Sequence, residues 1–194
     1  VREPRLIRPA NYPKLMDAPG RGADVFVTAE GMRVLVINVL GRVHMDPMDD
    51  PFSAVERELE AAPLGVVADA VIVDSHAAVT AEKMGMGHFC DGRASLVVGT
   101  HTHVPTADAQ ILPGGTAFQT DAGGCCDYDS VIGNDKEEPL RRFTTRLSGG
   151  RYAPAHGPAT VCGVFVETDD RTGLAKRIEP IRIGGRLIQA IPTL

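Results

Sequence analysis

The amino-acid sequence predicts a mixed α/β fold with sheets covered by helices. In the middle of the chain, strand-like segments at residues 70–74 and 95–98, which contain the apolar runs 70–73 and 96–98, alternate with segments that carry helical signals. Near each end, two runs of strand-forming residues are separated by a short turn, which is typical of a hairpin. Strands that alternate with helices indicate a sheet with helices packed on it.

Composition bounds the size and class of the protein. The chain has 194 residues, of which 43% are hydrophobic, so we expect a single domain over residues 1–194. A net charge of -5 argues against a protein that binds duplex nucleic acid. No apolar run could span a membrane and no signal core begins the chain, so we expect a cytoplasmic protein without membrane contact. The four cysteines form no C-x-x-C pair and are expected to be reduced thiols.

The first third of the chain predicts a strand pair and a helix. Residues 23–28 and 33–39 are rich in valine and other strand-forming residues, and the residues between them fit a hairpin turn. Asp50 is a favourable helix N-cap, and Pro51 fits the first helical position. The apolar residues that follow fall on one face, and the helix is expected to end near Pro63.

The remaining two thirds predict further strands and helices in turn. The helix after residue 80 is expected to stop at its glycines, and the last two strands are joined by a turn at residues 169–173. We expect strands at residues 70–74, 95–98, 116–120, 160–167 and 176–183, and helices at residues 80–86 and 137–147.

Two histidines follow directly after a buried strand. In Gly99-Thr100-His101-Thr102-His103 they are one residue apart, a spacing that puts both imidazoles on one side of an extended segment. A third histidine, His76, follows the strand at residues 70–74. Ligands of open α/β sheets collect outside the carboxyl ends of the strands. Neutral imidazoles aimed at one point suit a transition metal, so we expect His76, His101 and His103 to bind metal.

Three charged residues near these histidines have competing interpretations. Asp74 and Asp91 are candidates for the carboxylate that accepts the second N–H of a ligating imidazole. Asp74 lies two residues before His76 and could share its face, whereas Asp91 is better explained as a turn residue. Arg93 could contact a phosphate or form an ordinary structural salt bridge.

At these residues the chain resembles the YmdB-like group of calcineurin-like metallophosphoesterases. The resemblance runs through most of the chain in the family's order and is weakest at residues 124–135 and in the last hairpin. The matching stretches are RPANYP (8–13), INVLGRV (37–43), DDPF (49–52), DSHAAVTAEK (74–83), DGRASLVVGTHTHVPTAD (91–108) and ILPGGTAFQTDAG (111–123).

The resemblance implies a two-sheet sandwich flanked by helices, with a di-metal centre at the strand ends. Family members are associated with hydrolysis of cyclic nucleotides such as the 2′,3′ forms, so the implied partner is a small nucleotide or another phosphoester. His76 and His101 are similar to ligands of one ion and His103 to a ligand of the other. The ions would be iron, manganese or zinc. In the implied mechanism a metal-bound hydroxide attacks phosphorus while both ions stabilise the phosphoryl charge.

The sequence also departs from the family pattern. It lacks the GDV, GEN and GNH motifs that supply the other ligands and the histidine expected to protonate the leaving oxygen. Ala78 stands where the family often has glutamate. We therefore expect a C-terminal portion of the family fold without its N-terminal strands, leave the catalytic acid unassigned, and expect poor turnover by this chain alone. Uncovered strand edges favour a homo-oligomer.

Two other functions stay open at this point. The absent acid and carboxylates favour a non-catalytic module that regulates or binds a partner. Three histidines could instead build a mononuclear zinc hydrolase with an open water position. Metal content separates them: two ions per chain indicate the phosphodiesterase, one tight zinc the mononuclear enzyme, and none the non-catalytic module.

Overall fold

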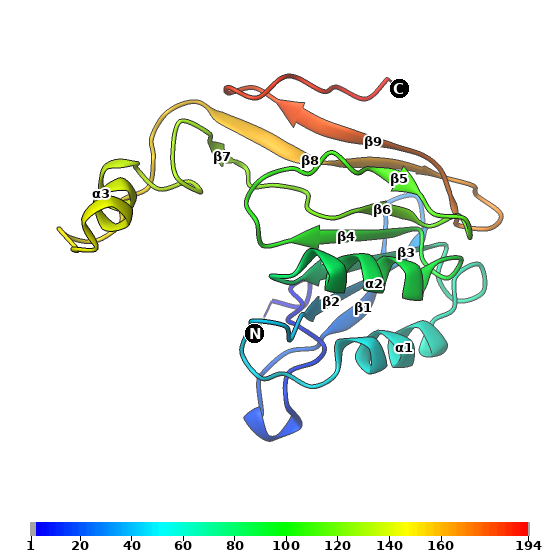
Figure 1. Ribbon diagram of the computed structural model, residues 1–194. Helices are drawn as coiled ribbons and strands as arrows, with labels where there is room; N and C mark the ends of the chain where they lie inside the picture. Colours follow the sequence, from blue (N-terminus) through cyan, green and yellow to red (C-terminus); the bar gives the residue numbers. More distant parts are fainter. Residues whose placement is uncertain (1–2, 194) are drawn as a thin grey trace.

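The chain folds into two sheets and three α-helices in the computed structural model, which describes residues 3–193 (Figure 1). This confirms the predicted mixed α/β class and the two sheets. One sheet has the order β1-β2-β3-β4-β6-β5 and the other the order β7-β8-β9. The strands are β1 (Ala23–Val27), β2 (Arg33–Leu40), β3 (Ala70–His76), β4 (Leu96–Thr100), β5 (Gln110–Ile111), β6 (Ala117–Gln119), β7 (Cys126–Asp127), β8 (Ala159–Thr168) and β9 (Ala175–Ile183).

The centre of the six-stranded sheet is parallel. Strands β2, β3, β4 and β6 run in the same direction, and the edge strands β1 and β5 are antiparallel to their neighbours. Val71, Val73 and Val97 are fully buried within this sheet, as expected where a parallel sheet is covered on its faces. Helix α1 (Pro51–Ala61) packs on β2, helix α2 (Thr80–Cys90) packs on β3 and β4, and β9 packs against β5 and β6.

The two packed helices begin and end for different local reasons. The predicted N-cap of α1 is confirmed, because an Asp50 carboxylate oxygen accepts the Ser53 N–H at 2.8 Å. The predicted end of α2 near residue 86 is wrong, since the helix continues to Cys90. A Cβ atom at Gly87 would lie 2.6 Å from the Phe118 ring. Glycine at this position therefore lets α2 approach β6 instead of stopping the helix.

A third helix, α3 (Glu137–Thr145), lies in the segment between β7 and β8, away from the other two helices (Figure 1). The structure thus confirms the helix predicted at residues 137–147. Phe143, which lies on this helix, is 77% exposed. A short 3-10 helix, η1 (Lys14–Met16), precedes β1. None of the helices within residues 3–193 is both long enough and apolar enough to cross a membrane.

Candidate functional site

The histidines predicted to bind metal lie at the carboxyl ends of two adjacent parallel strands. His76 is the last residue of β3, and His101 follows Thr100, the last residue of β4. The two strands are in register here, with His76 opposite Thr100. Because parallel strands end at the same edge of a sheet, this register brings the two imidazoles together.

The two imidazoles lie in contact and together line a small pocket. His101 Nδ1 lies 3.2 Å from His76 Nε2, and the ring planes are inclined at 80°. The pocket has a volume of about 230 Å³. It is lined by His76, Thr100, His101, His103, Asp121, Gly123 and Gly124.

Thr100 sets the tautomer of His76. The Thr100 hydroxyl lies 3.1 Å from an Asp74 carboxylate oxygen and 2.9 Å from His76 Nδ1. A hydroxyl has one proton, and a carboxylate can only accept, so the hydroxyl donates to Asp74 and accepts the N–H of His76 Nδ1. The Nε2 atom of His76 is then left with its lone pair directed at His101.

Asp74 supports His76 indirectly. The sequence suggested a direct contact between the two, but the carboxylate reaches the imidazole through Thr100, while Asn38 donates to its other oxygen at 2.7 Å. Burial raises the pKa of Asp74, and the hydrogen bonds from Asn38 and Thr100 oppose that rise. Burial, assisted by neighbouring His101, lowers the pKa of His76. A lowered pKa favours the neutral imidazole, which is the form that binds metals.

His103 lies at the same pocket but points elsewhere. The segment is not extended, because His101 and His103 have φ angles of 118° and 66°. The argument that both imidazoles share one side of an extended segment is therefore wrong. His103 Nδ1 lies 3.3 Å from the Ile132 carbonyl oxygen. Within residues 3–193 no three side chains of the His, Cys, Asp and Glu types form a group that could hold a metal ion.

A buried ion pair that was not predicted from the sequence lies beneath the histidines. Lys83 Nζ on α2 lies 3.0 Å from an Asp121 carboxylate oxygen, and both side chains are almost completely buried. The burial of Asp121 alone would raise its pKa, but the N–H groups of Thr102 and Gly123 and the Lys83 ammonium outweigh that effect and lower the pKa. One signal was available: Lys83 shares the buried stripe of α2 with Met86, Gly87 and Cys90. A charged residue on a buried helical stripe requires a partner.

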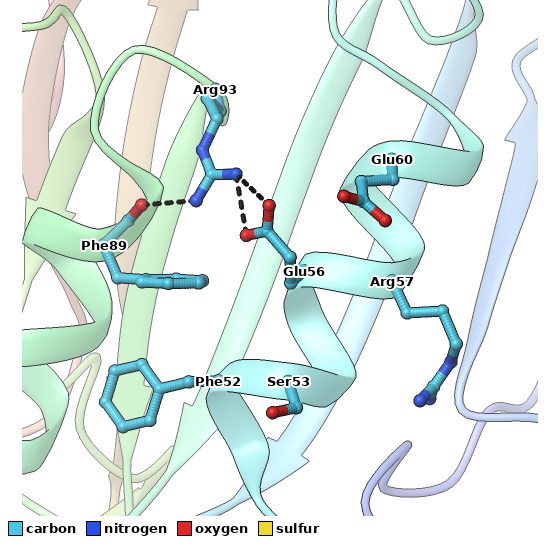
Figure 2. Close-up of a pocket in the computed structure, with 7 residues that line it drawn as sticks. All are labelled: Phe52, Ser53, Glu56, Arg57, Glu60, Phe89 and Arg93. Atoms are coloured by element: carbon cyan, nitrogen blue, oxygen red, sulfur yellow. Dashed lines mark hydrogen bonds and ion pairs between the residues drawn. The ribbon is translucent and has the colours of Figure 1, made fainter.

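The remaining candidates have structural roles. Asp91 accepts the N–H groups of Gly114 and Thr116, which confirms it as a turn residue. Arg93 donates to both carboxylate oxygens of Glu56, at 2.9 and 2.7 Å, and to the Phe89 carbonyl oxygen (Figure 2). It belongs to a separate, open pocket of about 550 Å³ beside α1, and its structural salt bridge is confirmed.

The separation of the two ring nitrogens in the histidine pocket matches that of two ligands of one divalent ion. Bonds of about 2.0–2.1 Å at a tetrahedral angle place two ligand nitrogens about 3.3 Å apart. The observed separation of His76 Nε2 and His101 Nδ1 is 3.2 Å. The Asp121 carboxylate lines the same pocket, but its oxygens already accept hydrogen bonds from Lys83, Thr102 and Gly123.

Comparison with known proteins identifies a matching family and a named relative. Residues 1–181 match the family model described as "YmdB-like protein". Over 181 residues the chain is 46% identical to a Bacillus subtilis protein named "2',3'-cyclic-nucleotide 2'-phosphodiesterase", covering 93% of this chain and 66% of that protein. The chain thus spans slightly less than two thirds of that relative's length.

Two solved structures share the fold. A hypothetical protein from Thermus thermophilus is 41% identical with a TM-score of 0.83, covering 93% of this chain and 68% of that chain. A novel phosphatase from Mycoplasma pneumoniae is 33% identical, also with a TM-score of 0.83, covering 94% of this chain and 64% of that chain. The family match at residues 1–181 includes the strands that carry the histidines, and the chain belongs to the YmdB-like protein family.

Proposed function

We propose that this chain carries the histidine part of the active site of a metal-dependent phosphodiesterase that acts on 2′,3′-cyclic nucleotides. The observation that supports this most directly is the 3.2 Å separation of His76 Nε2 and His101 Nδ1 at the ends of adjacent strands. The name of the Bacillus subtilis relative supports the substrate class. Iron, manganese and zinc all accept imidazole ligands, so any of them could occupy the site.

The chain's own residues would hold and orient the ion. His76 and His101 would be its ligands, with the N–H of His76 held by Thr100 and, through it, by Asp74. His103 lies beside the pocket and is proposed as a ligand of a second ion, which requires its ring to leave the Ile132 carbonyl oxygen. When bound, such ions lower the pKa of water and stabilise charge on phosphoryl oxygens.

We propose that efficient turnover needs groups beyond those of this pocket. Three neutral imidazoles cannot balance the charge of two divalent ions, and the carboxylate that lines the pocket, Asp121, is committed to Lys83 and to two backbone N–H groups. A mononuclear three-histidine site has less support, because no three His, Cys, Asp or Glu side chains within residues 3–193 form a group that could hold one ion. A non-catalytic role has no specific contact in its favour within the part of the chain that the structure describes.

Hydrolysis of a 2′,3′-cyclic nucleotide tests the proposal. Water adds across the phosphorus–O2′ bond, O2′ takes up the proton, and the product is a 3′-nucleotide, as the relative's name implies. We expect slow release of this product by the 194-residue chain with manganese, and loss of that release with a chelator or in His76→Ala and His101→Ala. A longer protein that includes the rest of the relative's length should be faster.

Two outcomes would count against the proposal. Hydrolysis that persists after chelation, or at an equal rate in both histidine variants, would contradict a role for the histidine pocket. Fast turnover by the 194-residue chain would contradict the need for further groups while leaving the pocket's role intact. Cytoplasmic location and self-association stay predictions, for which fractionation and sedimentation are the measurements.

A further inference from the structure

The buried ion pair of Lys83 and Asp121 touches the backbone on both sides of His101. Lys83 Nζ donates to the Thr100 carbonyl oxygen at 2.9 Å and to Asp121 Oδ2 at 3.0 Å. The same Asp121 oxygen accepts the Thr102 N–H at 2.8 Å, and Oδ1 accepts the Gly123 N–H at 2.9 Å. Two charged side chains therefore fix the residue before His101, the residue after it, and the glycine loop that lines the pocket.

The backbone around His101 makes room for the buried ion pair. A Cβ atom at Gly99 would collide with the Lys83 side chain and with the Thr120 carbonyl oxygen, so glycine provides the space through which the lysine passes. His101, with φ at 118°, and His103, with φ at 66°, lie in the left-handed half of backbone space. Non-glycine residues persist in such conformations only when surrounding contacts hold them there.

Fold stability alone does not explain the pair. Removing two charges from water costs several kcal/mol per ion, and well-packed apolar residues of similar size are often equally stable or better. The hydrogen bonds of the pair reach Thr100 and Thr102, which flank His101, and Gly123, which lines the pocket. Second-layer contacts of this kind orient the imidazoles that bind metals.

We infer that Lys83 and Asp121 are positioning residues that set the orientation of His101 toward His76, and so the metal affinity of the pocket. The inference rests on the proposed metal site for its functional consequence. Its structural content, the orientation of His101, can be measured without any metal. Neither residue is inferred to touch substrate or the reacting atoms.

The test compares the wild-type chain with Lys83→Met/Asp121→Leu, which removes both charges together and leaves neither ion unpaired. Co²⁺ is the probe, and its affinity is followed by the visible absorption of the bound ion. Ring ¹⁵N signals of His76 and His101, recorded without metal, give a second readout. Glu56→Gln is the matched control, because it breaks the Glu56–Arg93 ion pair in the separate pocket beside α1.

We expect the double variant to bind Co²⁺ about 10–100-fold more weakly while remaining folded. The ¹⁵N chemical shifts of the His101 ring should move away from their wild-type values, because the contact with His76 is lost. The control Glu56→Gln should match the wild type in both Co²⁺ affinity and ring signals. Asp121→Asn, which keeps the side-chain volume, serves as the second variant and should also weaken Co²⁺ binding.

Unchanged Co²⁺ affinity with unchanged ring signals in a folded double variant would overturn the inference. So would unfolding of both the double variant and Asp121→Asn, because the pair would then be required for the fold itself. If the wild type bound no Co²⁺ while the ring signals of His101 changed in the variant, the proposed metal site would fail but the positioning role would stand.

Discussion

Two glycines on α2 should respond differently to the same substitution. Gly85 and Gly87 are both interior residues of this helix, and neither has a positive φ angle. Replacing either with alanine removes the helical penalty of glycine, which stabilises the fold by about 1 kcal/mol. A Cβ atom at Gly85 would make an ordinary contact with Phe52 at 3.7 Å, so Gly85→Ala should keep the full gain.

Gly87→Ala meets a rigid obstacle. The new Cβ atom would lie 2.6 and 2.9 Å from two atoms of the Phe118 ring, which is only 1% exposed and closely surrounded. Overpacking of this kind costs about 1–3 kcal/mol, which offsets or exceeds the helical gain. We therefore expect Gly87→Ala to be about 1–3 kcal/mol less stable than Gly85→Ala.

Thermal unfolding followed by circular dichroism measures this difference. For a chain of this size, 1 kcal/mol corresponds to about 2–4 °C in Tm. Gly85→Ala should unfold above the wild type, and Gly87→Ala should unfold below Gly85→Ala by at least about 2 °C. Equal Tm values for the two variants would refute the reasoning that close packing on Phe118 explains why α2 continues through Gly87.

Three further predictions concern a ligand support, a helix cap and the thiols. Thr100→Val removes the hydroxyl between His76 and Asp74, so Co²⁺ affinity should fall about 10–100-fold; an unchanged titration would contradict the role of Thr100. Asp50→Ala removes the cap of α1 and should lower stability by about 1 kcal/mol in urea unfolding, whereas exposed Asp49→Ala should not. Burial raises the pKa of Cys90 to about 12, so pulse labelling with a thiol reagent should modify exposed Cys125 first; equal native rates would contradict this.

Local patterns were sufficient for most elements of the fold. The valine-rich runs became the buried strands β3 and β4, and the Asp50-Pro51 start of α1 was correct because capping depends on neighbours in sequence. The predicted end of α2 was wrong because glycine at position 87 makes room for the Phe118 ring, and Phe118 lies 31 positions later, on β6. Strands β5 and β7 have two residues each, too few for an alternating pattern.

The sequence singled out the three histidines that line the candidate site, but not their arrangement or the ion pair beneath them. Register between β3 and β4 brings His76 and His101 together, and it depends on tertiary pairing that periodicity does not encode. The turn after β4 depends on Asp121, whose carboxylate accepts the Thr102 N–H. The pairing of Lys83 with Asp121 spans 38 positions, so no local spacing rule could detect it.

Metal bound jointly by His76 and His101 is the central claim, and anomalous diffraction from zinc-soaked crystals tests it most directly. We predict an anomalous peak bonded to His76 Nε2 and His101 Nδ1, at about 2.0–2.1 Å from each nitrogen. The peak should disappear in crystals of His76→Ala. Zinc found only at other side chains, such as the thiol of Cys125, with the two ring nitrogens still in direct contact, would contradict the claim.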